Sequence, residues 1–322
     1  MSLIDVRNLR TWFPVRKGLL QRVHAHVRAV DDVSFTINKG QTLALVGESG
    51  CGKTTVGKSI VRLVAPHEGQ IIFQDRDLLE MDSKELAPYR QRIQIVFQDP
   101  ANSLDPRMLV RDIIAEGIRS FKLAQTNAQI DARVVDILNR VELSKDVMHR
   151  YPHEFSGGQR QRICIARALA VEPEFIICDE ATSALDVSVQ ASILNLLKGL
   201  QTEMGLTYLF ITHDLSVVEY LADQVAVMYL GQIVDEGTTD EIFSNPKHPY
   251  TQALIRAAPG LDPERQQLDE LLGEVPSPMD PPPGCRFHTR CPQLMRRCNS
   301  EEPDFYPVAG GRCRCFIHDP SK

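Results

Sequence analysis

The stretch Gly47-Glu48-Ser49-Gly50-Cys51-Gly52-Lys53-Thr54-Thr55 decides the fold. An apolar run at 42–46 precedes it, and a helical pattern begins at Lys53. The stretch matches GxxxxGK[ST], whose glycines let the backbone curl until its N–H groups and a helix N-terminus cradle phosphates. We expect Lys53 to reach the β- and γ-phosphates of a nucleotide and the Thr54 hydroxyl to contact Mg²⁺. Cys51 fills an unconstrained position of this predicted phosphate loop (47–55).

Strand-like and helix-like segments alternate along the chain around this loop. Short apolar runs bounded by polar residues are typical of buried parallel strands, and longer runs with helical periodicity are typical of helices. Such alternation predicts an α/β domain. Residues 107–150 are rich in helical pattern and read as an insertion. The other predicted segments are strands at 42–46, 93–97, 175–178 and 208–211, and helices at 160–170 and 187–200.

Two adjacent carboxylates end the strand predicted at 175–178. Asp179 fits the Mg²⁺-associated carboxylate of a nucleoside triphosphate site. Glu180 follows it and points in a different direction, so it is the candidate base that polarises the attacking water. Acidic pairs are common at strand ends, and it is the phosphate loop elsewhere in the chain that favours the catalytic interpretation.

Length and composition exclude several classes of protein. The chain has 322 residues, of which 43% are hydrophobic and 24% charged, ordinary values for a globular protein. No apolar run approaches the roughly 20 residues that cross a bilayer, and the N-terminal residues lack the apolar stretch of a signal peptide. The formal net charge of −6 argues against a dedicated nucleic-acid binder. A cytosolic protein is therefore expected, which does not exclude docking on a membrane partner.

A second potential phosphate contact precedes the helix predicted at 160–170. In Ser156-Gly157-Gly158-Gln159 the hydroxyl and the glycines would expose donors at a positive helix end. With the phosphate loop, these residues resemble the ATP-binding cassette (ABC) ATPases, whose signature motif is SerGlyGlyGln. The resemblance implies an ABC-type P-loop domain with a helical subdomain. It also implies that Ser156, Gly157, Gly158 and Gln159 bind the ATP of an opposing cassette, so that two cassettes enclose two ATP molecules.

The remaining cassette motifs follow in the family's order. Gln98 matches the Q-loop glutamine, which contacts Mg²⁺, and residues 183–186 match the D-loop at the dimer interface. His213 matches the switch histidine that contacts the γ-phosphate during catalysis. Phe13 lies where the family places an aromatic ring that stacks on adenine, and Trp12 is the rival for that role.

Longer stretches narrow the resemblance to one branch, the ATP-binding subunits of bacterial dipeptide/oligopeptide importers, and to the subunit type that begins PheProVal. Related nickel importers share much of the pattern. The stretches are PheProValArgLysGly (13–18), the phosphate loop, FQDPANSLDPR (97–107), HPYTQAL (248–254), GEVPSP (273–278) and GCRFHTRCP (284–292).

The resemblance implies an ATPase that powers uptake of di- or oligopeptides through a membrane transporter. Its implied partners are a second ABC ATPase, two transmembrane permease subunits and an extracytoplasmic binding protein, and we favour a heterodimer of ATPases. The chain would then lie on the cytoplasmic face of the inner membrane, bound peripherally. The sequence leaves the cargo open among dipeptides, oligopeptides, nickel and glutathione.

Two other classes of function compete with transport. A soluble ABC ATPase that acts on nucleic acid or ribosomes is disfavoured, because only one cassette is present and the segment between Lys53 and Ser156 is too short for a long coiled coil. A metal-sensing or redox module centred on the C-terminal cysteines is the third alternative, with ATPase activity secondary.

The composition changes after residue 236. We predict an ABC nucleotide-binding domain over 1–236, with its helical subdomain at about 100–158, and a C-terminal extension over 237–322. Residues 275–284 contain too many prolines for a helix or a central strand and read as a semi-rigid spacer.

Five of the eight cysteines crowd the end of the chain. In a reducing cytosol, clustered thiols suggest metal binding before disulfides. No CxxC pair occurs there, which disfavours zinc, whereas a 4Fe–4S cluster admits more varied spacing of four thiolates. Some members of the resembled branch hold such a cluster in this region, and zinc is the alternative. The predicted ligands are Cys285, Cys291, Cys298 and Cys315, with Cys313 as the alternative fourth.

Overall fold

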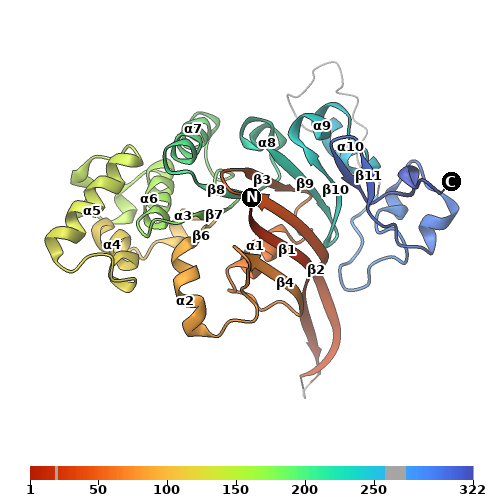
Figure 1. Cartoon of the computed structure of the whole chain (residues 1–322), viewed down its shortest axis with the longest axis horizontal. Coiled ribbons are helices and arrows are strands. Elements are labelled where there is room, and N and C mark those ends of the chain that lie inside the picture. The colour runs from red at the N-terminus through yellow and green to blue at the C-terminus, as the bar shows by residue number, and fades with distance from the viewer. Residues whose placement is uncertain (19–20, 258–272, 322) are drawn as a thin grey trace. The chain divides into compact units, whose positions relative to one another are not determined.

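The computed structural model of the chain describes residues 1–18, 21–257 and 273–321 (Figure 1). The chain divides into two compact units: residues 1–79 with 211–322, and residues 80–210. Parts of the predicted extension, residues 258–272 and 322, lie outside the described residues, and its predicted boundary at residue 236 stays a prediction.

The first unit contains a long antiparallel pair at the start of the chain. β1 (Ser2–Lys17) pairs with β2 (Arg22–Asn38), and the register shifts at several points along the ladder. β4 (Glu68–Phe73) continues this sheet on the other side of β1, and β5 (Arg76–Asp77) forms its edge, so the strand order is β2-β1-β4-β5. Sequence analysis assigned no strand to residues 2–38.

A second sheet of the first unit carries the phosphate loop. β3 (Thr42–Val46) is buried throughout and pairs in parallel with β9 (Gln224–Tyr229), which confirms the strand predicted at 42–46. The order continues through antiparallel β10 (Gln232–Thr238), β12 (Gly311–Cys313) and β11 (Tyr306–Val308). The end of the chain therefore adds two strands to the sheet that holds β3 (Figure 1).

Short helices complete the first unit. Among the described residues of this unit, the helices are α1 (Lys53–Ile60), α8 (Leu215–Leu221), α9 (Thr239–Ser244) and α10 (Pro249–Arg256), and the 3₁₀ turns are η4 (His288–Arg290), η5 (Arg296–Asn299) and η6 (Phe316–His318).

Residues 275–284 form turns and bends with no helix or strand, as the prolines predict.

The second unit combines parallel strands with helices. β6 (Ile93–Val96) pairs in parallel with β7 (Phe175–Asp179), and β8 (Thr207–Thr212) lies on the other side of β7 and leads back into the first unit. These strands confirm the predictions at 93–97, 175–178 and 208–211. The helices and 3₁₀ turns are α2 (Ser83–Arg92), α3 (Pro100–Ser103), α4 (Val110–Ser120), α5 (Asn127–Arg140), η1 (Lys145–His149), η2 (Pro152–Glu154), α6 (Gly157–Leu169) and α7 (Val187–Met204).

The helix-rich stretch of the second unit has an ordinary amphipathic basis. α4 buries Ile113, Ile114 and Ile118, and α5 buries Val134 and Leu138. Their helical spacing places these side chains on one face of each helix. No helix in the described part of the chain is both long and apolar enough to cross a membrane.

Aromatic rings form the core on which the end of the chain packs. Tyr229 of β9, Tyr250 of α10 and Phe287 are almost fully buried. The ring centroid of Tyr229 lies 4.7 Å from that of Tyr250 and 5.3 Å from that of Phe287. Rings at these separations add to the stability that burial alone provides. The core thus joins a central strand to residues from the last quarter of the sequence.

Acid is expected to destabilise this core through His248. The side chain is buried, its Nδ1 accepts a hydrogen bond from the Tyr250 N–H at 3.0 Å, and burial, with the charge of His318 adding, lowers its pKa to about 3. In the unfolded chain the ring titrates near its ordinary pKa of about 6.5. Between these two pKa values only the unfolded state binds the proton. The stability that the neutral His248 ring contributes is therefore complete above pH 6.5 and is lost as the pH falls. The cost at pH 5 is about 2 kcal/mol.

Urea unfolding between pH 7.5 and pH 5 measures this contribution. His248→Asn keeps a helix-capping side chain without the titration, so its free energy of unfolding should fall less with acid than that of the wild type. The matched control, His24→Asn, changes an exposed ring and should keep the wild-type pH dependence. Equal pH dependence of the wild type and His248→Asn would show that His248 is not the titrating group.

Candidate functional site

The phosphate loop runs from the end of β3 to the start of α1. Its backbone requires glycine at two points where φ is positive, +152° at Gly47 and +110° at Gly52. A Cβ at Gly47 would lie 2.1 Å from the Met228 carbonyl oxygen, and one at Gly52 would lie 2.0 Å from that of Ala29. The loop is therefore pressed between β9 and β2, and larger residues are excluded on steric grounds as well as by backbone strain.

The N-terminus of α1 is left open by its sequence. Gly52 occupies the N-cap position without a side chain that could accept from the first-turn N–H groups, and that turn holds no acidic residue. Such a helix end presents backbone donors and a positive dipole end to an anion. The predicted ligands Ser49, Gly50, Thr54 and Thr55 lie in this loop or in the first turn.

Lys53 is buried, and its ammonium group lies on the loop itself. Its Nζ donates to the carbonyl oxygens of Gly47 at 2.8 Å and of Glu48 at 3.0 Å. The Cys51 thiol is also within reach, at 3.7 Å, and burial raises its pKa, which keeps it an uncharged thiol. Lys53 is thus fixed where a bound phosphate chain would meet the loop.

In the second unit, the predicted base has an identifiable partner. Asp179 ends β7 and is 3% exposed, and Glu180 follows it with a φ of +48°. The Glu180 Oε2 atom accepts a hydrogen bond from the Gln98 amide nitrogen at 2.6 Å. A non-glycine residue held at positive φ is unusual and is often found at functional sites. The structure therefore brings two of the predicted site residues, Gln98 and Glu180, together.

The predicted signature motif begins α6 with a reciprocal cap. The Ser156 hydroxyl accepts from the Gln159 N–H at 3.4 Å, and the Gln159 Oε1 accepts from the Ser156 N–H at 3.1 Å. This capping box satisfies two of the donors at the helix start. Ser156 and Gln159 thus hold the helix terminus, and the exposed Gly157 lies next to Ser156 at its tip.

Two predicted residues of the first unit remain at its surface. His213 follows β8 and is exposed. Phe13 is 38% exposed, whereas the Trp12 ring stacks on His67 with centroids 5.0 Å apart and donates through Nε1 to Asp31 at 3.3 Å. Trp12 thus has partners within the first unit, whereas Phe13 leaves part of its side chain exposed, and the choice of Phe13 for adenine stays a prediction.

Four of the C-terminal cysteines face one cavity. Its walls include Cys285, Cys291, Cys298 and Cys315, with apolar neighbours such as Phe287 and Phe316. Burial, with the other three thiols adding, raises the pKa of Cys285 to about 12. Within the described ranges, no three His, Cys, Asp or Glu side chains are arranged to hold a metal ion.

Cys313 has a different environment from these four. It lies in β12 opposite Asp235 of β10 and is fully buried. Burial and the Asp235 carboxylate raise the pKa of its thiol.

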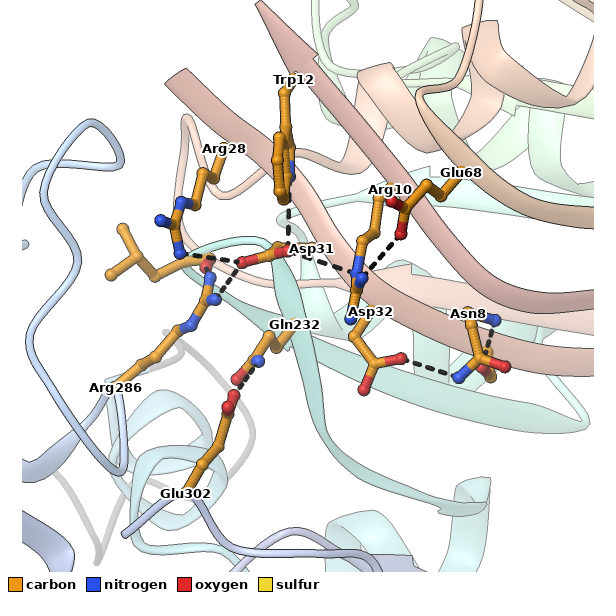
Figure 2. Close-up of polar contacts among 12 residues, drawn as sticks. Asn8, Arg10, Trp12, Arg28, Asp31, Asp32, Glu68, Gln232, Arg286 and Glu302 are labelled. Atoms are coloured by element: carbon orange, nitrogen blue, oxygen red, sulfur yellow. Dashed lines mark hydrogen bonds and ion pairs between the residues drawn. The ribbon is translucent and has the colours of Figure 1, made fainter. Parts of the chain in front are cut away.

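Sequence analysis missed a set of arginines near the end of the chain that contact the loop and β2. Arg290 donates to both carboxylate oxygens of Glu48 in the loop, at 2.8 and 3.0 Å. Arg286 pairs with the buried Asp31 of β2, where Arg10, Arg28 and Trp12 also converge (Figure 2). The signal in the sequence is a concentration of arginines among the cysteines, for which the sequence analysis made no prediction.

Comparison with known proteins matches the chain to two protein families. The family model described as "ABC transporter" matches residues 30–183, and the one described as "Oligopeptide/dipeptide transporter, C-terminal region" matches residues 234–298. The solved ATP-binding cassette MJ0796 bound to ADP and Pi is 28% identical, with a TM-score of 0.65, and the alignment covers 73% of this chain and 98% of that chain.

Relatives align over nearly the whole chain. The probable peptide ABC transporter ATP-binding protein y4tS of Sinorhizobium fredii is 48% identical, over 99% of this chain and 91% of its own length. The oligopeptide transport ATP-binding protein AppF of Bacillus subtilis is also 48% identical, over 96% and 94%. The dipeptide transport ATP-binding protein DppF of Escherichia coli is 46% identical, over 98% and 95%.

The fold, the loop and these matches define the chain as an ABC ATPase with a P-loop fold. It belongs to the family of ATP-binding proteins of peptide and dipeptide ABC importers. The predicted family is thereby confirmed, whereas the PheProVal subunit type stays a prediction.

The two signature glycines are expected to respond differently to alanine. A Cβ at Gly158 would lie 2.4 Å from a Val189 methyl of α7, whereas one at Gly157 would lie 3.4 Å from a Leu185 methyl. Gly158→Ala should therefore destabilise the protein by about 1–3 kcal/mol through overpacking, and Gly157→Ala by no more than about 0.5 kcal/mol. Thermal and urea unfolding of the matched pair measure the difference, and equal stability of the two variants would contradict the packing of α6 against α7.

Proposed function

We propose that the chain hydrolyses ATP to power uptake of di- or oligopeptides through a membrane transporter. The observation that carries the proposal is the combination of an open, lysine-bearing phosphate loop with a C-terminal region that matches the oligopeptide/dipeptide transporter family. The relatives are named as peptide, oligopeptide and dipeptide transport proteins, which supports the same class of cargo.

In the proposed site, the N–H groups of the loop and Lys53 bind the phosphates of ATP. The oxygen donors of Thr54, Gln98 and Asp179 suit Mg²⁺, a hard cation that prefers such ligands. When bound there, Mg²⁺ neutralises part of the phosphate charge. Thr54 lies in the first unit, whereas Gln98 and Asp179 lie in the second. The ligand set is therefore proposed from the chemistry of the oxygen donors alone. Phe13 is proposed to stack on adenine.

Glu180 is the proposed general base. Its carboxylate takes a proton as the water oxygen attacks the γ-phosphorus, and the bond from that phosphorus to the bridging oxygen of ADP breaks. The amide nitrogen of Gln98 donates to this carboxylate at 2.6 Å, and Glu180 has a positive φ of +48°. His213 is proposed to contact the γ-phosphate during the reaction.

The signature motif is proposed to complete the site of a second ATPase chain. Ser156, Gly157 and Gln159 are exposed at the start of α6, with Gly158 buried among them, and such a helix start is suited to an anion brought by another molecule. The solved MJ0796 cassette is described as dimeric, which supports a paired arrangement. We propose a heterodimer of ATPases bound to two permease subunits on the cytoplasmic face of the membrane, with an extracytoplasmic binding protein that delivers the cargo.

The C-terminal cysteines are proposed to hold a 4Fe–4S cluster. Four thiols around one apolar cavity supply the Cys₄ donor set that such a cluster uses. Cys315 lines this cavity, which supports it over Cys313 as the fourth ligand. The proposed role is structural or regulatory, and a cluster would join segments of a small region that has little core of its own.

Glu180→Gln should lower ATP hydrolysis by about 10²–10⁴-fold in the assembled transporter, because the amide keeps the shape but cannot accept the proton. Nucleotide binding should survive in this variant, whereas Lys53→Ala should lose it. A phosphate-release assay measures hydrolysis, with the corresponding glutamate of the partner ATPase also changed. Glu203→Gln is the control, because Glu203 lies exposed on α7 and pairs with Arg140. Near-normal hydrolysis by Glu180→Gln would show that Glu180 is not the general base.

Anaerobically purified protein should contain about four iron and four sulfide per chain. Cys285→Ser removes a proposed ligand and should lose the iron. Cys313→Ser should retain it, because Cys313 lies in β12 and is not among the residues that line the cavity. Analysis of iron and acid-labile sulfide measures the content of the wild type and of both variants. Stoichiometric zinc without sulfide would contradict the proposal of a 4Fe–4S cluster.

A further inference from the structure

Glu48 lies within the phosphate loop, yet most of its contacts come from the end of the chain. Its carboxylate receives two hydrogen bonds from Arg290, at 2.8 and 3.0 Å. Its backbone N–H donates to the Tyr250 hydroxyl at 2.9 Å. Its carbonyl oxygen accepts from the Lys53 ammonium at 3.0 Å. One residue thus connects the ammonium group that meets phosphate to an arginine far away in the sequence.

The Arg290–Glu48 pair is shielded from water on the arginine side. The Arg290 side chain is 4% exposed and that of Glu48 is 22% exposed. The Glu48 carboxylate raises the pKa of Arg290, so the guanidinium stays charged. A two-bonded guanidinium–carboxylate pair fixes the orientation of both partners as well as their separation. Arg290 also lies within 5.8 Å of the Tyr229 ring centroid, which limits its freedom further.

The segment that carries Arg290 is itself anchored. Arg286, on the preceding turn, pairs with Asp31 and donates to the Leu230 carbonyl oxygen at 2.6 Å (Figure 2). Phe287 is 1% exposed, with its ring centroid 5.4 Å from that of Tyr250. Arg290 therefore projects from a rigid base, and Tyr250 reaches the loop from the same core.

We propose that Arg290 is a positioning residue for nucleotide binding: by holding Glu48, it fixes the carbonyl oxygens and the Lys53 ammonium of the phosphate loop in their binding geometry. The end of the chain thereby sets the affinity of the loop for ATP and ADP. This inference rests on the proposed role of the loop, and it adds a residue that makes no phosphate contact of its own.

Arg290→Ala should weaken binding of Mg²⁺-ADP about 10-fold, because Glu48 loses its restraint and the loop must be ordered by the ligand. Arg290→Lys keeps the charge but loses the planar fork, so we expect about a 3-fold loss. In the assembled ATPase, the KM for ATP should rise while kcat changes less than about twofold, because the interaction is the same in the ground and transition states. Titration calorimetry of the full-length chain measures the dissociation constant.

A double-mutant cycle separates this role from general loosening of the fold. Glu48→Gln alone should weaken binding, but in the Arg290→Ala background it should add little, since both changes break one interaction. Arg297→Ala is the matched control, because Arg297 pairs with Asp319 and stacks on Phe316 in the same region. It should bind Mg²⁺-ADP within twofold of the wild type.

The outcomes decide between failure of the site and failure of the inference. If Lys53→Ala binds Mg²⁺-ADP like the wild type, the proposed loop site is wrong. If Lys53→Ala loses binding but Arg290→Ala and Arg290→Lys bind like the wild type, the inference alone is overturned. Additive effects of Glu48→Gln and Arg290→Ala would also overturn it. If Arg290→Ala does not fold, the milder Arg290→Lys and Glu48→Gln variants provide the same test, because each is expected to weaken binding of Mg²⁺-ADP.

Discussion

The ion pair between Glu48 and Arg290 links the phosphate loop to the end of the chain, and neighbouring arginines extend the same contact. Arg286 pairs with Asp31, Arg314 with Asp32, and Arg312 donates to the Ser34 carbonyl oxygen. Since β2 also packs against Gly52 of the loop, β2 and the loop are both held from the C-terminal side. Arg286 and Asp31 are both buried, and removing one partner of such a pair costs about 3–5 kcal/mol. Arg290 contacts the loop directly, whereas Arg286, Arg312 and Arg314 contact β2.

Strain and packing explain why the loop needs this support. Gly47 and Gly52 adopt positive φ with backbone oxygens directly beside them, and the first turn of α1 has no side-chain cap. A loop that leaves its donors open for phosphate cannot use those donors to hold its own shape. Its shape is therefore fixed from outside, by Ala29, Met228, Tyr250 and Arg290. Glu180, in the second unit, has a comparable arrangement, with positive φ and a hydrogen bond from Gln98.

Local pattern predicted the elements that surround the chemistry. The strands at 42–46, 175–178 and 208–211 are short, apolar and buried, and the one at 93–97 is short and half-buried, so their composition alone identifies them. The loop motif follows from steric needs of glycine. The pairing of β1 with β2 was missed because long strands with several register shifts blur the alternation of polar and apolar residues. Arg290 and Glu48 could not be paired from sequence, because their contact depends on how the chain end packs against Tyr229 and Tyr250.

Hydrogen exchange of the full-length chain, measured by mass spectrometry with and without Mg²⁺-ADP, tests most directly whether the loop and the chain end act as one unit. The account predicts that the nucleotide slows amide exchange in peptides that cover 47–55 and also in those that cover 285–291, while peptides from 127–140 in α5 keep their rates. Slower exchange at 47–55 with no change at 285–291 would contradict the account, because the phosphate loop would then respond to its ligand independently of the segment that holds Glu48.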